Sequence, residues 1–503
     1  MADQRAIGKA TPLETPAMLT KIPILIGFLL LGLPVWAFNL VRIATIPRGH
    51  INFYQLPVGD LNHNGWQELV FEQSLKPFST NVWEHWGANS YQPVQVSQEG
   101  CSPAAVGDPD QDGRSDLLCQ WKGRALLLES RTPTTLPHRV VWEEPVGGFP
   151  GIRGYFVDTD QDHQQEMWIV PNTPNMIEIW ESWGDNTYEP VALLSHPLMN
   201  PTTLAFGDFD GDNQTEIVVG TVEGLLFVWE NSGNDAWELV WSHAFPLNQD
   251  AGIVAAAHDL DGDGRAEFLV GGRRLDTFEH VVTIFEQTGD NTYAPVWQLQ
   301  GDGSFVRTSV RVGDVDGDEQ EEFAVAIPGA IQLYKATGDN SFSLIGEVPC
   351  TDGHAFQLAD LNGNGVAELI SNAPGGEHLS LYEWATLHPP VLIPAFFPLR
   401  YRIRPRLPLP VWLELFNQSE VTQTIDAWVS IYQGIGRGGP QGSPLRQQQL
   451  FTQKFLSPQT YFHRWAVLRI PGRPGRYTLQ LQIGTFPDQP LDTKWFTIWV
   501  TLP

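Results

Sequence analysis

Short apolar runs, rich in β-branched and aromatic residues and punctuated by glycine, alternate with acidic stretches over most of the chain. "TTLAFGD" (202–208) leads into one acidic stretch, and "EIVVGTVEGLLFVWE" (216–230) follows it. Such runs are typical of β-strands, and no ten-residue helical periodicity surrounds the acidic stretches. The pattern predicts that each acidic stretch is a loop joining two strands of a hairpin.

The acidic stretch recurs seven times, with first acids 46 to 55 residues apart. These first acids are Asp60, Asp108, Asp158, Asp208, Asp259, Asp314 and Asp360. A repeat of about 50 residues is the spacing of a propeller or solenoid array.

A second signature follows the loop in five of the repeats, as in "VWEHWGANSYQPV" (82–94) and "IWESWGDNTYEPV" (179–191). A strand ends in an aromatic residue, a Gly-Asp-Asn turn follows, and the next strand begins with another aromatic residue; glycine and asparagine suit such tight turns. Each unit thus has two hairpins, and seven four-stranded units predict a seven-bladed β-propeller over residues 51–390. The second and last units, near 129–142 and 382–393, lack this signature, so their outer strands and the closure of the ring stay open.

The pattern changes after a proline-rich linker at 388–399. Segments such as "PVWLELFN" and "RYTLQLQI" alternate apolar and polar residues with a period of two, which predicts antiparallel strands. We expect a separate β-sandwich over residues 398–503, immunoglobulin-like in size.

The N-terminal region contains 20 uncharged residues, 22–41, between Lys21 and Arg42. At about 1.5 Å per residue a helix of this length spans a hydrocarbon core of about 30 Å. We predict one transmembrane helix at 22–41 after an N-terminal tail, 1–21. The alternative is a cleaved signal peptide with Val35 and Ala37 at its cleavage site, although the polar lead is long for one.

The charge of the chain excludes one class of function. The formal net charge is −28, which argues against nucleic-acid binding because that needs a basic face. Residues 391–503 depart from this balance, with 12 Lys and Arg against 5 Asp and Glu. Of the three cysteines, Cys101 and Cys119 flank the second loop, and both a disulfide and two unpaired thiols remain open for them.

The acidic loops place carboxylate or amide side chains at positions 1, 3 and 5 and an acid at position 9. An EF-hand loop instead needs a Glu at position 12 and flanking helices, and position 12 is never acidic here. Position 6 needs a tight bend, which Gly and Asn suit better than His163 or Glu319 do. Two carboxylates about 4 Å apart repel by roughly 4 kcal/mol at an effective dielectric of about 20, and an oxygen-only ligand set selects a hard cation such as calcium.

The loops resemble the FG-GAP/VCBS repeats of integrin α-subunit propellers, with the motif D-x-[DN]-x-[DN]-x-x-x-[DE] repeated over roughly 51–395. The resemblance implies a structural calcium site in each loop, up to seven ions in all. The loops with Asn at positions 3 and 5 carry fewer charges and should bind more weakly. The predicted ligands are Asp60, Asn62, Asn64 and Glu68; Asp108, Asp110, Asp112 and Asp116; Asp158, Asp160, Asp162 and Glu166; Asp208, Asp210, Asp212 and Glu216; Asp259, Asp261, Asp263 and Glu267; Asp314, Asp316, Asp318 and Glu322; and Asp360, Asn362, Asn364 and Glu368.

Three classes of function follow from this organisation. We favour a non-enzymatic interaction or adhesion module, or an accessory subunit of a membrane complex, anchored by its N-terminal helix with the propeller outside the cytoplasm. The alternative is a carbohydrate-binding propeller, because pairs such as Trp83 with Tyr91 suit sugar stacking; packing between blades explains the same pairs. A polysaccharide-acting enzyme is disfavoured, since the motif acids are committed to metal and no G-x-S-x-G or H-E-x-x-H motif occurs.

Overall fold

A computed structural model of the chain describes residues 40–500, except for a set of short stretches. These stretches are 48–55, 74–78, 88–89, 97–99, 147–151, 172–174, 247–248, 250–251, 304–307, 351–355, 373–377, 385–391, 399–401, 404–406, 418–421, 435–442, 458–459, 471–472 and 486–488. The described residues are all-β and contain no helix.

Four-stranded antiparallel sheets repeat along residues 40–384, and seven of them lie in the described part of the chain. We number them in chain order as sheets 1 to 7. Sheets 1 to 3 contain β2 (Val58–Gly59), β3 (Glu68–Gln73), β4 (Ser79–His85) and β5 (Tyr91–Val96); β6 (Ser102–Gly107), β7 (Asp116–Trp121), β8 (Arg124–Glu129) and β9 (Arg139–Pro145); and β10 (Arg153–Val157), β11 (Glu166–Val170), β12 (Met176–Ser182) and β13 (Tyr188–Ser195). Sheets 4 to 6 contain β14 (Pro201–Gly207), β15 (Glu216–Thr221), β16 (Leu225–Gly233) and β17 (Ala236–Ala244); β18 (Ile253–Ala257), β19 (Glu267–Arg273), β20 (Glu279–Gly289) and β21 (Thr292–Gly303); and β22 (Val310–Gly313), β23 (Glu322–Ile327), β24 (Ala330–Gly338) and β25 (Ser341–Pro349).

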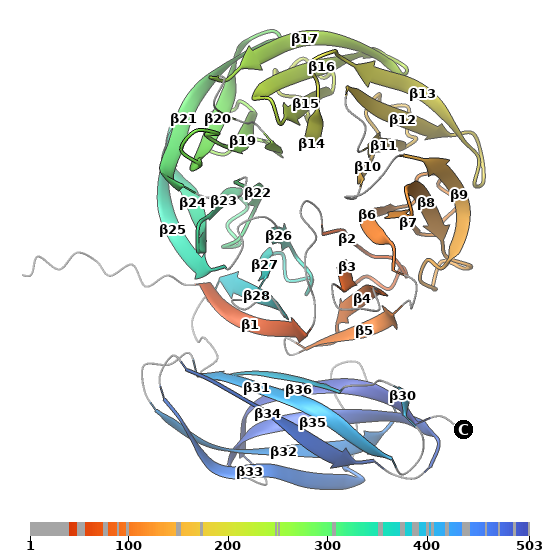
Figure 1. Cartoon of the computed structure of the whole chain (residues 1–503), viewed down its shortest axis with the longest axis vertical. Helices are drawn as coiled ribbons and strands as arrows, with labels where there is room; N and C mark the ends of the chain where they lie inside the picture. The colour runs from red at the N-terminus through yellow and green to blue at the C-terminus, as the bar shows by residue number, and fades with distance from the viewer. Residues whose placement is uncertain are drawn as a thin grey trace, which may run out of the picture. The chain divides into compact units, whose positions relative to one another are not determined.

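The sheets surround a common centre, and in sheets 1 to 6 the first strand is innermost and the fourth lies at the rim (Figure 1). This is the arrangement of a β-propeller. Neighbouring sheets bury apolar side chains against each other: Val218 and Val228 of sheet 4 share a core with Phe268 of sheet 5. The hydrophobic cores therefore lie between the sheets and fix their spacing around the ring.

Sheet 7 is completed by a strand from the beginning of the described chain. Its order is β1 (Leu40–Pro47), β28 (His378–Trp384), β27 (Glu368–Asn372) and β26 (Phe356–Ala359). β1 pairs antiparallel with β28, from Leu40 opposite Trp384 to Pro47 opposite His378. Ile43 and Ile46 are buried in a core that includes residues of β27 and β28. The closure of the ring, which the sequence left open, thus uses "LVRIATIP", ahead of the predicted propeller start at residue 51.

The predicted transmembrane segment, 22–41, and the tail before it lie outside the described residues, except for Leu40 and Val41. Those two residues begin β1. Across the part of the chain that is described, no helix is long and apolar enough to cross a bilayer.

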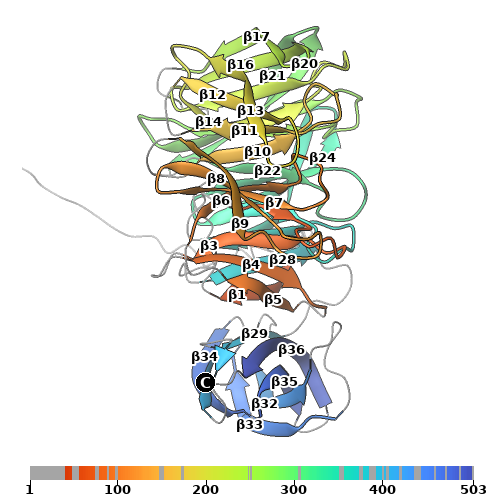
Figure 2. The same cartoon turned by 90° about the vertical axis from the view of Figure 1, so that its right-hand side faces the viewer.

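Residues 392–500 form two further sheets, drawn in blue in Figures 1 and 2. One contains β29 (Leu392–Pro398), β31 (Pro408–Asn417) and β34 (Thr460–Arg469); the other contains β30 (Arg402–Ile403), β36 (Gln489–Val500), β35 (Gly475–Thr485), β32 (Gln423–Gln433) and β33 (Arg446–Leu456). In β31 every second side chain is fully buried in a core shared with β32 and β35, namely Leu409, Val411, Leu413 and Leu415. The period-two pattern of the sequence therefore corresponds to one buried face of this strand.

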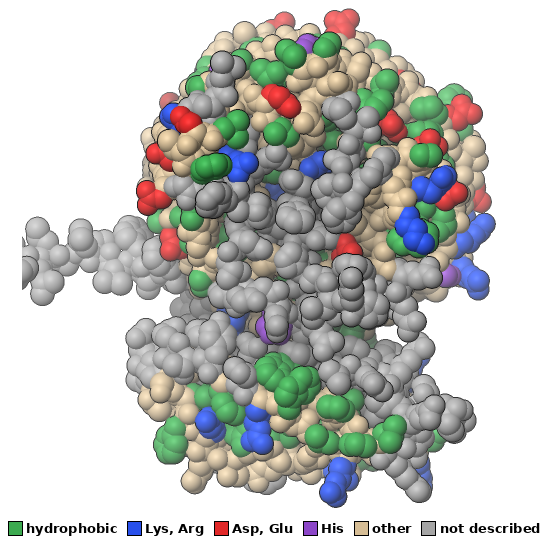
Figure 3. Space-filling model, viewed as in Figure 1, with side chains coloured by type: hydrophobic (Ala, Val, Ile, Leu, Met, Phe, Trp, Pro, Cys, Tyr) green, Lys and Arg blue, Asp and Glu red, His purple; other side chains and the backbone are tan. Residues whose placement is uncertain are grey.

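Charge is distributed unevenly over the visible surface. On the face shown in Figure 3, Asp and Glu side chains lie around the ring of sheets together with some Lys and Arg, whereas the charged side chains visible over the C-terminal sheets are Lys and Arg. The same imbalance is present in the sequence counts.

Two cysteines form a disulfide in sheet 2. Cys101 precedes β6 and Cys119 lies in β7, with their Cα atoms 5.7 Å apart. The third cysteine, Cys350, is buried and is not part of this disulfide. Of the two alternatives left open by the sequence, the structure therefore has the disulfide.

Candidate metal centre

The seven acidic stretches join the innermost strand of each sheet to the next strand, and we call them loops 1 to 7. Loop 4 runs between β14 and β15, and its last acid, Glu216, is the first residue of β15. The predicted position of the motif, in a hairpin between two strands, is the one observed.

The first aspartate of each loop holds the loop backbone in place. In loop 4, Asp208 Oδ1 accepts hydrogen bonds from the N–H groups of Gly211 (2.7 Å) and Asp212 (3.2 Å). Its Oδ2 accepts from the N–H of Asn213 at 3.0 Å. The bond to the N–H at position 6 recurs in all seven loops, at 2.7–3.1 Å.

These bonds require a left-handed backbone at two positions of the loop. At position 6 all seven residues have φ between 69° and 90°, including His163 and Glu319, for which that conformation costs roughly 1–2 kcal/mol. The predicted bend is therefore present in every loop. Position 4, where no bend was predicted, is also left-handed, with φ of 62° at Gln161 and 79° at Gly211.

The acid at position 9 lies beneath the loop and is buried. Glu216 is 0% exposed, and its Oε2 accepts a hydrogen bond from the N–H of Phe209 at 2.5 Å. Its Oε1 is buried and has no hydrogen-bond partner in the described part of the structure; the same holds for Oε1 of Glu166 and of Glu267. Burial raises the pKa of Glu216 to about 8, with the charges of Asp210, Asp208 and Asp212 adding to the effect.

The carboxylates of loops 3, 4 and 5 converge on one point in each loop. One oxygen from each of the four predicted ligands lies within 4.8 Å of the other three. In loop 4 the buried Oδ1 of Asp210, like Oε1 of Glu216, has no partner among the described residues. Buried carboxylates with unpaired oxygens are unfavourable unless a cation joins them. An oxygen-only set of this kind fits a calcium ion.

A further acid, which was not among the predicted ligands, lies beside the position 9 acid in six of the seven sheets. Glu230 of β16 is paired in register with Glu216 across the β15–β16 ladder. The equivalent residues are Glu84, Glu129, Glu181, Glu286 and Glu383, and Lys335 in sheet 6. In sheets 1, 3, 4 and 5 the signal in the sequence was the acid that follows the aromatic residue at the start of the second signature, as in "VWE" and "IFE". Sheets 2 and 7 have the same acid after Leu128 and Tyr382, outside that signature.

The turn of the following sheet docks on the same acids. Asn291, in the turn between β20 and β21, donates its N–H to Asp210 Oδ2 at 2.7 Å and its side-chain amide to Glu230 Oε1 at 2.6 Å. Asn186 makes the same two bonds to Asp110 and Glu129, and Asn340 makes them to Asp261 and Glu286. Asp235 donates its N–H to Asp160 at 3.1 Å. An acidic loop and the Gly-Asp-Asn turn of the next sheet therefore form one hydrogen-bonded structure across the gap between two sheets.

The remaining loops differ in charge. In loops 1 and 7, Asn62 and Asn362 hydrogen-bond to the buried Glu68 and Glu368. In loop 2, Arg114 lies 3.2 Å from Glu129 and 2.9 Å from Asp185. In loop 6, the acids at positions 3, 5 and 9 form ion pairs with Lys335.

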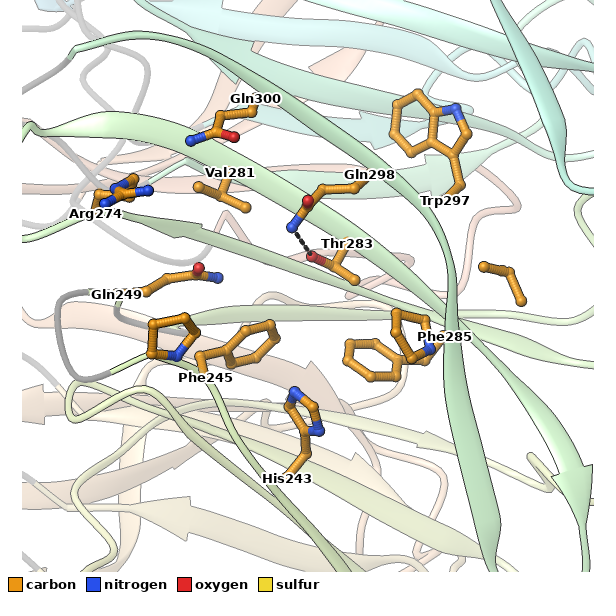
Figure 4. A pocket seen from close by; sticks show the side chains of 13 residues that line it. His243, Phe245, Gln249, Arg274, Val281, Thr283, Phe285, Trp297, Gln298 and Gln300 are labelled. Atoms are coloured by element: carbon orange, nitrogen blue, oxygen red, sulfur yellow. Dashed lines mark hydrogen bonds between the residues drawn. The ribbon is translucent and has the colours of Figure 1, made fainter.

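The aromatic residues of the second signature pack between sheets. Trp180 lies edge-on to Trp142 of sheet 2 at 5.0 Å between ring centroids, and Trp237 lies edge-on to Trp168 of sheet 3 at 5.2 Å. Figure 4 shows a pocket between sheets 4 and 5 in which His243, Phe245 and Phe285 lie together. Phe245 and Phe285 are 9% and 0% exposed, so their faces are not open for stacking on a sugar ring.

Comparison with known proteins identifies FG-GAP-like repeats in part of the chain. The model of the "FG-GAP-like repeat" family matches residues 208–270, 259–325 and 314–371, and each match begins at the first aspartate of a loop. Integrin alpha-IIb of Homo sapiens is 27% identical over 214 residues, and that of Mus musculus is 26% identical over 217 residues. Both alignments cover 36% of this chain and 20% of the integrin, so the chain spans about a fifth of the length of the curated relatives it matches. The predicted resemblance to FG-GAP repeats and integrin α subunits is confirmed.

A solved structure of BBS1N in complex with ARL6DN aligns with 70% of this chain and 98% of its own, at 13% identity and a TM-score of 0.49. That likeness is too distant to bear on function.

Proposed function

We propose that this FG-GAP-repeat, integrin alpha-like chain is a non-enzymatic interaction or adhesion module whose propeller is stiffened by calcium. The observation that carries the proposal concerns Glu166, Glu216 and Glu267: each has a buried oxygen without a hydrogen-bond partner among the described residues, and each clusters with the other acids of its loop. A scaffold of this kind presents loops to a partner without chemistry of its own.

Calcium would be held most strongly by loops 3 and 4. There the four predicted ligands converge, and Glu181 and Glu230 add a fifth negative charge close to acids of their loops. In loops 2 and 5 an arginine pairs with the fifth acid, as Arg114 does with Glu129 and Arg265 with Glu286. These pairs reduce the net negative charge, and we propose weaker sites there and in loops 1 and 7. When bound, the ion would neutralise the loop; the chain's own residues supply the bend, the ligands and the contact with the next sheet.

We propose that the seven four-stranded sheets are the blades of one seven-bladed propeller. The pairing of β1 with β28, which completes the seventh sheet, supports this. We further propose that residues 392–500 form a β-sandwich, since side chains of the three-stranded and five-stranded sheets share one core.

We propose that the propeller lies outside the cytoplasm. The Cys101–Cys119 disulfide supports this location because disulfides persist mainly in oxidising compartments. Calcium sites of extracellular modules often bind at about 10⁻⁴–10⁻³ M, which fills them only outside the cytosol. An anchor over 22–41, shortened by the two residues that begin β1, would tether the propeller to a membrane.

The calcium proposal is tested by thermal unfolding of the full chain in detergent, with excess calcium or excess chelator. We expect the chelator to lower the melting temperature by about 5 °C or more, because the loops then hold unneutralised charge, and we expect calcium but not equimolar magnesium to restore it. An equal melting temperature under both conditions would contradict structural calcium. The interaction proposal is tested on the same extract by native size and by identification of co-migrating chains: a fixed assembly supports an accessory subunit, whereas a monomer favours a receptor.

A further inference from the structure

Loop 6 has the same backbone as the proposed calcium loops. Asp314 accepts hydrogen bonds from the N–H groups of Gly317 at 2.6 Å and Glu319 at 2.9 Å. Glu322 is 0% exposed, and its Oε2 accepts from the N–H of Val315 at 2.9 Å. Any difference in what the loop binds must therefore come from its side chains.

The difference is a lysine in the middle of the loop's acids. Lys335 Nζ lies 2.8 Å from Asp316 Oδ2, 2.7 Å from Asp318 Oδ2 and 2.8 Å from Glu322 Oε1. Glu322 Oε1 corresponds to the oxygen that has no partner, among described residues, in Glu166, Glu216 and Glu267. The ammonium group thus occupies the place in loop 6 that corresponds to the point on which the carboxylates of loops 3 to 5 converge.

Lys335 also reverses the charge at its position. The equivalent residue is a glutamate in the other six sheets, so sheet 6 exchanges a fifth negative charge for a positive one. Burial lowers the pKa of Lys335, but its hydrogen bonds to Asp316, Asp318 and Glu322 outweigh this and raise it above the ordinary value. The hydrogen bond from Lys335 lowers the pKa of Asp318.

Loop 6 also differs from loops 2 to 5 in its contacts with the following sheet. Loops 2 to 5 each receive a turn from the following sheet. Sheet 7, which follows loop 6, takes its outer strand from β1, so β28 does not continue through a hairpin turn into an outer strand. Among the described residues, no outer hairpin turn of sheet 7 bonds to the acids of loop 6, and Lys335 supplies a donor from its own sheet.

We propose that Lys335 takes the place of the metal ion in loop 6. This loop therefore binds no calcium, and it keeps its conformation when calcium is removed. This inference rests on the proposed function, because it treats loops 3 to 5 as calcium sites. It lowers the predicted maximum of seven ions to six.

The test compares the wild-type chain with Lys335→Glu, which restores the residue of the other six sheets. Lys122→Glu is the matched control, since Lys122 is an exposed lysine in the turn between β7 and β8, away from the loops. Bound calcium per chain is measured by equilibrium dialysis, and hydrogen exchange of residues 314–338 is followed with calcium and with chelator. Lys335→Gln, which removes the ammonium without adding a charge, replaces Lys335→Glu if that variant does not fold.

We expect Lys335→Glu to bind one more calcium ion per chain than the wild type and Lys122→Glu to bind the same number. In the wild type, chelation should speed exchange in loops 3 to 5 but leave 314–338 unchanged; in Lys335→Glu it should speed exchange in 314–338 as well. An unchanged ion count in the variant, or chelator-sensitive exchange at 314–338 in the wild type, would overturn the proposal. If the wild type bound no calcium, the proposed calcium function would be refuted. If Lys335→Glu then bound one ion, the role of Lys335 would still be supported.

Discussion

At the scale of single residues, the two carboxylate oxygens of the acid at position 9 have different roles. In Glu216 one oxygen accepts the N–H of Phe209 and fixes the start of the loop, while the other is buried and faces the remaining carboxylates. The same division is present in Glu166 and Glu267. A buried carboxylate in such a place either binds a cation or takes up a proton.

This choice gives the metal-free protein an unusual dependence on pH. Burial raises the pKa of Glu166, Glu216 and Glu267 to about 8, against an ordinary value of about 4.5. Between these values the folded chain holds protons that the unfolded chain has lost, so the free energy of unfolding falls as pH rises. In excess chelator we expect the melting temperature to decrease from pH 5 to pH 8, and we expect the gain from added calcium to increase over the same range.

Two variants sharpen this measurement. Glu216→Gln removes one of the titrating groups but keeps an oxygen for the Phe209 N–H, so its melting temperature in chelator should fall less steeply with pH. Glu223→Gln, at an exposed position of the same sheet, should follow the wild type. A melting temperature in chelator that is flat or rises over this range would contradict the titration of these acids.

At the scale of elements, the unit that matters is a loop together with the turn of the next sheet. Asn291 bonds to two acids of sheet 4 although it belongs to sheet 5. Loops also touch each other directly: Gln161 of loop 3 donates its amide to the carbonyl of Asn213 in loop 4 at 3.0 Å. A change in the charge of one loop is therefore felt at the boundary with its neighbour.

We expect Asn291→Gly to lower the free energy of unfolding by roughly 1.5–3 kcal/mol, the usual range for a hydrogen bond to a charged group. Glycine tolerates the φ of 52° at this position, so the loss reports the side-chain amide rather than backbone strain. The measurement is denaturant unfolding, with hydrogen exchange over 208–216 as a local readout. Asn234→Gly, in the exposed turn of sheet 4, is the control; equal losses in the two variants would show that docking of the Asn291 side chain contributes nothing.

Much of this element-level organisation could be predicted from the sequence because it repeats. The hairpin position of the loops and the bend at position 6 followed from local spacing and from the residues that tolerate a left-handed backbone. The hydrogen bonds of Asn291 and the ion pairs of Lys335 depend on which strands and sheets become neighbours. The spacing of residues along the chain does not reveal those neighbours. β1 was missed for a different reason: "LVRIATIP" continues an apolar run that begins well before it, and hydropathy alone does not mark where a membrane-like segment gives way to a strand.

At the scale of the whole molecule, the seventh sheet is completed by the eight residues of β1. β1 buries Ile43 and Ile46, and these two side chains alone contribute roughly 3–6 kcal/mol. The pairing also covers the edge of β28, which would otherwise be an open strand edge.

We therefore expect removal of residues 1–39 to leave a folded chain, whereas removal of 1–47 should abolish the cooperative melt or lower the melting temperature sharply and promote aggregation. Circular dichroism melting and size-exclusion chromatography distinguish the two. The shorter truncation also tests the anchor, because it removes nearly all of 22–41: release into the soluble fraction supports a membrane tether there, and persistent membrane association contradicts it. A 1–47 truncation as stable as the 1–39 truncation would show that β1 is not needed for closure.

The pairing of β1 with β28 also determines how the propeller responds to mechanical force. The chain enters the ring at Leu40 and leaves it after Trp384, and these two residues are partners at the same end of one antiparallel pair. Tension between the segments before and after the ring would thus act across a single rung and would not be transmitted through sheets 1 to 6. Such tension would separate β1 from β28 one hydrogen bond at a time, beginning at Leu40. The ring of sheets would therefore open at sheet 7 first.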